Sequence, residues 1–193
     1  MRKYFASIPH SILKTQLGQV FKDPKLLTIF DAIIDSYPTK NGKGLPIGNL
    51  TSQYFANHYL CSLDHFIKEQ LYGKAYVRYM DDLIIWHTDK NQLKNIYTKI
   101  QFFTENQLLL TLKPELLNQT KKGLPFLGYL IYPYYTRLKQ QSKQRFIKKY
   151  KAIEKAYHTG KSTPAECQRK VLPLIAFTNH ADAKKFRSQI INN

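Results

Sequence analysis

The chain has 193 residues, 43% of them hydrophobic and 13% aromatic, which predicts one or two folded domains with a sizeable core. Thirty Lys and Arg residues against thirteen Asp and Glu leave a formal charge of +17 at pH 7, which indicates a polyanionic partner and favours nucleic acid. Two cysteines without a pairing or metal-binding pattern exclude a disulfide framework and a zinc site, and the absence of a signal peptide or long apolar run predicts a cytoplasmic protein without a membrane partner.

Apolar residues at helical spacing predict core helices near the start of the chain. The first covers residues 7–17, and a second follows Asp23 and Pro24, which suit an N-cap and a first helical turn. Residues 40–48 form a loop rich in Gly and Lys. Asn49 or Thr51 caps a further helix that runs to about Leu71.

Two adjacent carboxylates, Asp81 and Asp82, lie between segments of strand character. The pattern predicts a hairpin with both acids at the tip of a buried ribbon. Two ionised neighbours repel each other, and burial further raises the free energy of their charged forms. The pair therefore favours a bound divalent cation such as Mg2+. An exposed polar turn is the alternative that the pair alone leaves open.

The second half of the sequence predicts a helix over residues 90–106 capped by Asp89, a strand over 108–112 and a strand or hairpin over 123–132. Helices follow from Ser142, with breaks at Thr163 and near Pro173. The apolar residues of these helices are expected to form a seam between them: Phe146, Ile153, Val171, Leu174, Ile175, Phe177, Phe186 and Ile190. Residues 137–193 hold fourteen Lys or Arg and three acidic residues, a net +11. The C-terminal helices are therefore expected to be the stronger contact to a nucleic-acid backbone.

Four blocks of the sequence, in order, resemble motifs of the reverse transcriptases. Tyr79-Met80-Asp81-Asp82 resembles the catalytic motif in the palm of the polymerase hand. Residues 44–53 resemble the loop-to-helix element that contacts template and incoming nucleotide, residues 112–114 the lysine-bearing motif, and residues 126–129 the primer grip. The resemblance implies an α+β fold, with an antiparallel palm sheet and packed helices in residues 1–135, a helical thumb in 136–193 and no fingers.

The resemblance also implies the roles of individual residues in adding deoxynucleotides to a primer on an RNA template. Asp81 and Asp82 would be catalytic and would hold two Mg2+ ions, for which Mn2+ could substitute. The implied nucleotide-binding residues are Phe5, Ile47, Gly48, Gln53 and Lys113. The implied primer-binding residues are Phe126, Leu127 and Gly128. Phe5 would exclude a 2'-hydroxyl, and Lys113 would lie near the outgoing pyrophosphate.

Residues 1–10 resemble the second half of a further reverse-transcriptase motif, in which a metal-binding aspartate would immediately precede Met1 and the aromatic pair Tyr4 and Phe5 would lie in a strand. We interpret the sequence as N-terminally truncated: a fragment, the product of a misplaced start codon, or a decayed gene. We expect that this chain alone cannot polymerise, because Asp81 and Asp82 supply one side of a two-metal site.

The combination of Ile47 with Gln53, and residues 59–66, resemble the reverse transcriptases of diversity-generating retroelements. That subgroup implies lowered fidelity, and as partners a template RNA, a primer or cDNA, deoxynucleotides and a small basic accessory protein. The alternatives are a retron, abortive-infection or group II intron type of reverse transcriptase, and a catalytically inactive nucleic-acid-binding remnant. A third interpretation is a basic α/β domain of unrelated role, in which Asp81 and Asp82 form an ordinary turn. It predicts no dependence on metal.

Overall fold

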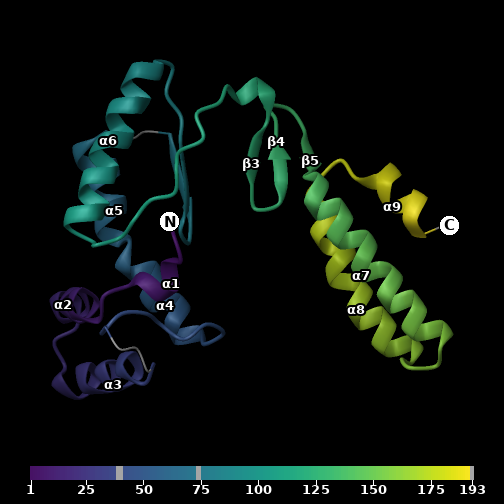
Figure 1. Cartoon of the computed structure of the whole chain (residues 1–193), viewed down its shortest axis with the longest axis horizontal. Coiled ribbons are helices and arrows are strands. Elements are labelled where there is room, and N and C mark those ends of the chain that lie inside the picture. Colours follow the sequence, from purple (N-terminus) through teal and green to yellow (C-terminus); the bar gives the residue numbers. More distant parts are fainter. Residues whose placement is uncertain (38–40, 73–74, 192–193) are drawn as a thin grey trace. The chain divides into compact units, whose positions relative to one another are not determined.

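The computed structural model describes residues 1–37, 41–72 and 75–191, which form a mixed α+β chain. The chain divides into two compact units, Met1–Glu115 and Leu116–Asn193 (Figure 1). This division precedes the predicted palm–thumb boundary at residue 135, because the strands that follow residue 123 pack with the C-terminal helices. Lys40, the first residue of a predicted loop, lies outside the described residues.

The first unit is mainly helical. Its elements are α1 (Tyr4–Ser7), α2 (His10–Val20), α3 (Pro24–Asp35), α4 (Leu50–Tyr59), α5 (Cys61–His65), the π-helical turn η1 (Phe66–Gln70), the strands β1 (Tyr76–Tyr79) and β2 (Asp82–Ile85), and α6 (Lys90–Asn106). The predicted caps are confirmed. The side chains of Asp23, Asn49 and Asp89 each accept a hydrogen bond from a backbone N–H in the first turn of α3, α4 and α6.

The core of the first unit lies between α2, α3, α4, α5 and α6. It is built from fully buried apolar side chains: Ile8, Leu13, Ile34, Leu45, Leu60, Leu63, Ile67, Ile100 and Leu108. Tyr59 is also fully buried, and its hydroxyl donates to the Leu108 carbonyl at 2.6 Å. This hydrogen bond fastens the segment after α6 to the helix that follows the Gly-rich loop.

Two predicted strands of the first unit are wrong. Leu108 and Leu110 are buried while Leu109 is 52% exposed, so burial alternates along the segment 108–112 as it would in a strand. The segment is coil because, within the described residues, no strand pairs with it. Its link to the start of the chain is a single backbone hydrogen bond, from the Arg2 N–H to the Thr111 carbonyl at 3.0 Å. The aromatic pair near the start, which the family resemblance placed in a strand, forms the short helix α1.

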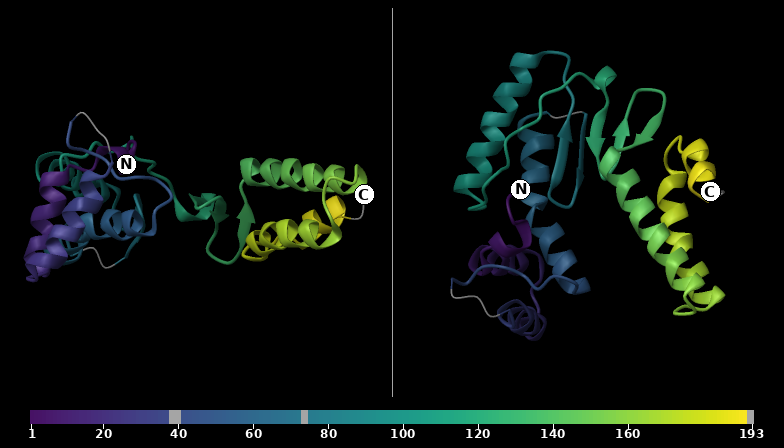
Figure 2. Two further views of the ribbon diagram at one scale, coloured as in Figure 1. Left: turned by 90° about the horizontal axis from the view of Figure 1, so that it is seen from below. Right: turned by 45° about the vertical axis from the view of Figure 1, so that its right-hand side comes forward.

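The second unit combines a small sheet with three helices. The 3-10 turn η2 (Thr120–Lys122) precedes β3 (Leu124–Phe126), β4 (Tyr129–Ile131) and β5 (Thr136–Leu138), which form an antiparallel sheet in that order. The helices are α7 (Gln140–His158), α8 (Pro164–Asn179) and α9 (Lys184–Ile191), and α7 and α8 lie side by side (Figures 1 and 2). The Tyr129 hydroxyl donates to the Phe177 carbonyl at 2.7 Å, which joins the sheet to α8.

The predicted break at Thr163 is confirmed, and the one near Pro173 is wrong. Thr163 caps α8 through a capping box with Glu166. Helix α8 continues through Pro173 and ends at Asn179, because the fixed φ of proline is compatible with a helix even though one backbone donor is lost.

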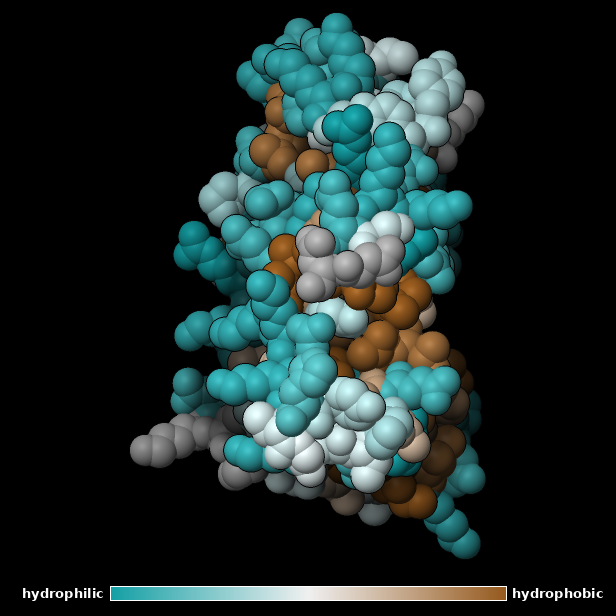
Figure 3. Space-filling model, turned by 90° about the vertical axis from the view of Figure 1, so that its right-hand side faces the viewer, coloured by the Kyte–Doolittle hydropathy of each residue, from teal (hydrophilic) through white to brown (hydrophobic). Residues whose placement is uncertain are grey.

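The outer surface of the second unit is mostly polar. Figure 3 shows hydrophilic side chains over much of one face, with apolar side chains gathered in patches between them. The predicted apolar seam is confirmed: its residues Phe146, Ile153, Val171, Leu174, Ile175, Phe177, Phe186 and Ile190 are buried or half-buried. Nowhere in the described ranges does a helix have the length and apolar character that crossing a membrane requires.

Candidate active site

The predicted hairpin is confirmed, and its register corrects the positions of the two acids. Tyr79 pairs with Asp82 across the antiparallel strands, so Met80 and Asp81 form the connecting turn and Asp82 opens β2. The ribbon is not buried on both faces, because Val77 and Tyr79 are 45% and 58% exposed. A short ribbon whose inner face alone packs on the core leaves its tip open to a ligand.

Asp81 lies beside the first residue of the chain. The Met1 nitrogen is 3.4 Å from the Asp81 Oδ2 atom and 3.3 Å from its carbonyl oxygen, and Met1 itself is buried. The Asp81 side chain is 30% exposed, and Asp82 is exposed. An atom bonded to the Met1 nitrogen would therefore lie close to the Asp81 carboxylate.

The two carboxylates fit part of a divalent-metal site. Carboxylate oxygens are the ligands that Mg2+ prefers, and Mg2+ usually takes one or two of them together with substrate phosphates. No cluster of three His, Cys, Asp or Glu side chains that could hold a metal occurs in the part of the chain that the structure describes. Asp81 and Asp82 could therefore hold an ion only with further oxygen ligands from a substrate or another residue.

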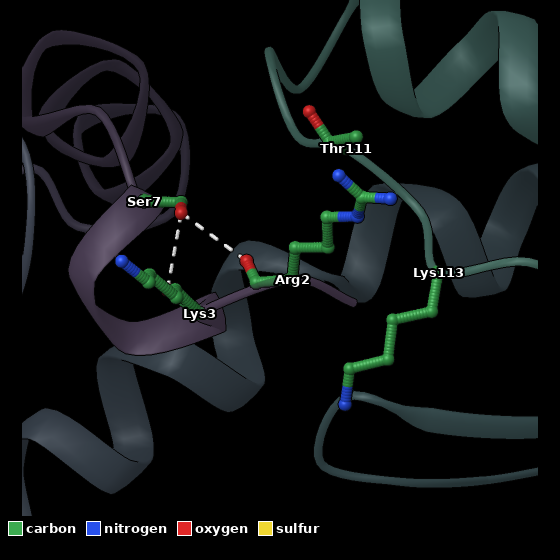
Figure 4. Close-up of a pocket in the computed structure, with 5 residues that line it drawn as sticks. All are labelled: Arg2, Lys3, Ser7, Thr111 and Lys113. Carbon is green, nitrogen blue, oxygen red and sulfur yellow. Dashed lines mark hydrogen bonds between the residues drawn. The ribbon is translucent and has the colours of Figure 1, made fainter.

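A basic pocket lies within the first unit. A hollow of about 410 Å³ is lined by Arg2, Lys3, Ser7, Thr111 and Lys113, and Figure 4 shows these side chains around it. The Ser7 hydroxyl donates to the carbonyl oxygens of Arg2 and Lys3, at 3.2 and 3.0 Å. Three cationic side chains at one hollow favour a polyanion such as a phosphate chain.

Sequence reasoning named Lys113 and missed Arg2 and Lys3 as its neighbours. The backbone hydrogen bond from Arg2 to Thr111 brings these distant parts of the chain together. The available signal was the basic pair Arg2 and Lys3, which follows Met1 and so lies near the position expected for the metal-binding aspartate. Periodicity gave no indication that residues 111–113 lie beside this pair.

Phe5 and the Gly-rich loop are brought together by backbone hydrogen bonds. The Leu45 N–H donates to the Phe5 carbonyl at 2.9 Å, and the Gly44 N–H donates to the Ile8 carbonyl at 2.7 Å. The His10 ring, through Nε2, is 2.7 Å from the Gly44 carbonyl oxygen. The loop is thus anchored on the segment that carries Phe5.

The tip of that loop and the start of α4 are open to solvent. Ile47 is 83% exposed, and Gln53 is exposed on the first turns of α4. Gly48 has a φ of 96°, and an added Cβ atom would meet nothing within 4 Å. These three residues therefore form an accessible edge, as a nucleotide contact requires.

The three predicted primer-binding residues lie in the second unit. Phe126 ends β3, and Leu127 and Gly128, with φ values of 47° and 90°, form the turn to β4. The Gly128 carbonyl accepts from the Ser142 hydroxyl at 2.7 Å and from the Lys139 N–H at 3.0 Å. The turn is therefore held against the start of α7.

Comparison with known proteins places this arrangement in a family. A search of curated proteins finds no match for the chain. The family model for reverse transcriptase (RNA-dependent DNA polymerase) matches residues 1–131, which include the Asp81–Asp82 hairpin, the basic pocket and the Gly-rich loop. The chain belongs to the reverse transcriptase family.

Proposed function

We propose that this chain carries the catalytic hairpin of an RNA-directed DNA polymerase, in which Asp81 and Asp82 hold Mg2+. The observation that carries the proposal is the hairpin, whose acids lie in the same unit as the three cations of the basic pocket. The first unit would act as palm and the second as thumb. Its partners would be template RNA, a primer and deoxynucleotides.

Each site residue has a proposed task in nucleotide addition. Asp81 and Asp82 would hold Mg2+, whose charge would activate a primer hydroxyl and stabilise the departing pyrophosphate. Arg2, Lys3 and Lys113 bind the phosphates of the incoming nucleotide, and their positive charge offsets the negative charge that develops in the transition state. The Phe5 ring excludes a 2'-hydroxyl and so selects deoxynucleotides.

Three further residues of the first unit, on the exposed edge, bind the nucleotide itself. Gly48 lets the backbone approach the base or sugar closely, and Gln53 offers a polar contact at the start of α4. Ile47 presents an aliphatic side chain, which supports a low-fidelity enzyme of the diversity-generating retroelement type, with a small basic accessory protein as partner. Phe126, Leu127 and Gly128 grip the primer.

The position of Met1 supports a complete metal site in a longer chain. A peptide C–N bond of about 1.33 Å would join a preceding residue to the Met1 nitrogen. Since that nitrogen lies 3.4 Å from the Asp81 carboxylate, an aspartate at this point would add a carboxylate beside the hairpin. The two-metal mechanism needs such convergence of carboxylates from separate segments.

A second candidate function is a nucleic-acid-binding remnant without catalysis. The specific observation in its favour is that the described residues gather no third metal-binding side chain at Asp81 and Asp82. The formal charge of +17 would still favour binding to an RNA–DNA duplex.

Mg2+-dependent primer extension on an RNA template separates the two candidates. Three proteins are compared: this chain, the chain with the segment encoded upstream of Met1, and that longer protein with Asp81→Asn. The proposal expects extension by the longer protein only, and loss of extension with Asp81→Asn. If the longer protein binds the duplex and never extends the primer, the remnant is the correct description.

A further inference from the structure

A half-buried ion pair lies at the base of the catalytic hairpin. The guanidinium of Arg78, on β1, donates through Nε to the Asp64 Oδ1 atom at 2.7 Å and through Nη2 to Oδ2. The side chains of Arg78 and Asp64 are 9% and 24% exposed. The Tyr76 hydroxyl also donates to Asp64 Oδ1, at 2.7 Å, so this carboxylate anchors two residues of β1 on α5.

The same guanidinium reaches the turn that carries Asp81. Its Nη1 atom donates to the Met80 carbonyl at 3.0 Å and to the Asn57 Oδ1 atom at 2.7 Å. One planar group thus connects α4, α5 and the tip of the hairpin. A lysine ammonium carries its three donors on one nitrogen at the end of a flexible stem, and could not reproduce this planar fork.

The turn needs such support because of its backbone. Met80 has a φ of 54°, a left-handed conformation that is unfavourable for residues other than glycine. The Met80 carbonyl belongs to the peptide bond that leads into Asp81. Without a donor on that carbonyl, the turn would be free to relax toward right-handed geometry and to move the Asp81 carboxylate.

We propose that Arg78 is a positioning residue for the polymerase reaction, which fixes the Met80–Asp81 turn through the Met80 carbonyl and is itself held by Asp64 and Asn57. This inference rests on the proposed function for its catalytic consequence. Arg78 lies outside the metal-binding pair, and its task is to set the position of the Asp81 carboxylate.

The charge state of the pair suits this task. Burial alone would raise the pKa of Asp64, but hydrogen bonds from Arg78 and Tyr76 and the neighbouring positive charge lower it below its ordinary value. Asp64 therefore stays ionised at neutral pH, and its negative charge balances the positive charge of Arg78.

The test compares Arg78→Lys with Tyr76→Phe as a matched control. Both variants remove hydrogen bonds to Asp64 Oδ1, but only Arg78→Lys also removes the bond to the turn. Backbone hydrogen exchange is measured on the 193-residue chain. We expect exchange at Asp82 and Ile84, which pair with Tyr79 and Val77 in the hairpin, to become about tenfold faster in Arg78→Lys and to change little in Tyr76→Phe.

A second readout uses primer extension by the longer protein. Arg78→Lys should lower kcat and raise the Mg2+ concentration for half-maximal rate several-fold, with little change in KM for the deoxynucleotide, because only the carboxylate position is altered. Tyr76→Phe should leave the Mg2+ dependence unchanged. A lesion that merely reduced stability would shift neither quantity selectively.

Arg78→Gln combined with Asp64→Asn serves if Arg78→Lys does not fold, since it removes both charges together and leaves no buried ion without a partner. It should show the same faster exchange at the turn. Equal exchange at the turn in the Arg78 variants and in Tyr76→Phe would overturn the inference. If the longer protein never extends a primer, the proposed function fails, while the exchange experiment still decides whether Arg78 holds the turn.

Discussion

Replacing Gly128 by alanine should destabilise the second unit far more than the same change at Gly160. Both glycines have positive φ values, 90° and 68°, so alanine at either position pays the left-handed cost of about 1–2 kcal/mol. At Gly128 the new Cβ atom would also lie 2.9 Å from the Ser142 Oγ atom and 3.1 Å from a ring carbon of Phe177. At Gly160 it would meet nothing within 4 Å.

The difference between the two variants follows from that close approach. Overpacking of this kind costs about 1–3 kcal/mol, so Gly128→Ala should lose about 2–5 kcal/mol and Gly160→Ala about 1–2 kcal/mol. Alanine also lowers the conformational entropy of the unfolded chain, which favours the folded state. This effect is the same in both variants and cancels in the comparison.

Urea unfolding followed by far-UV circular dichroism measures these losses. The fluorescence of Trp86, the single tryptophan, reports the first unit in the same samples. Equal losses in the two variants would refute the close packing of the Gly128 turn against Ser142 and Phe177.

Three further changes test other parts of the structure. Tyr59→Phe removes the donor to the buried Leu108 carbonyl and should cost about 1–3 kcal/mol in urea unfolding monitored by Trp86; no loss would contradict that contact. Thr163→Ala removes the cap of α8 and should cost about 1 kcal/mol of thermal stability, whereas an unchanged melting temperature would argue against the capping box. Because the pKa of Asp64 is lowered in the folded chain, its stabilisation is present at neutral pH and is lost as pH falls below about 4. Asp64→Asn should therefore flatten the pH dependence of unfolding free energy in that range, and an unchanged slope would contradict the pairing with Arg78.

Local sequence signals predicted the helices and turns well, because they act through neighbouring residues. Asp23 and Asp89 cap helices where a carboxylate precedes apolar periodicity, and Asp81 lies in a hairpin turn between two short β-rich segments. The division between the units was not predictable in this way. It depends on which helices the β3–β5 sheet packs against, through contacts such as Tyr129 with Phe177.

The errors arose where a local pattern needed a distant partner. The apolar run at residues 108–112 predicted a strand, but a strand also requires a neighbouring strand to pair with, which single-sequence patterns do not reveal. For the same reason Arg2 and Lys3 were not recognised as neighbours of Lys113, and Arg78 was not recognised as the support of the Asp81 turn. At Pro173 the local pattern predicted the end of a helix, but α8 continues through this residue because the packing of the helix favours it.

We propose that Asp81 holds a metal ion together with the side-chain carboxylate of an aspartate joined to the Met1 nitrogen by a peptide bond. The most direct measurement is Mn2+ binding, followed by electron paramagnetic resonance of the free ion, to this chain preceded by a single Asp, by a single Asn, or by Asp together with Asp81→Asn. We expect the Asp-preceded chain to bind Mn2+ about tenfold or more tightly than the other two, because only it has both the preceding carboxylate and that of Asp81. Equal affinity in all three proteins would contradict the proposed metal site.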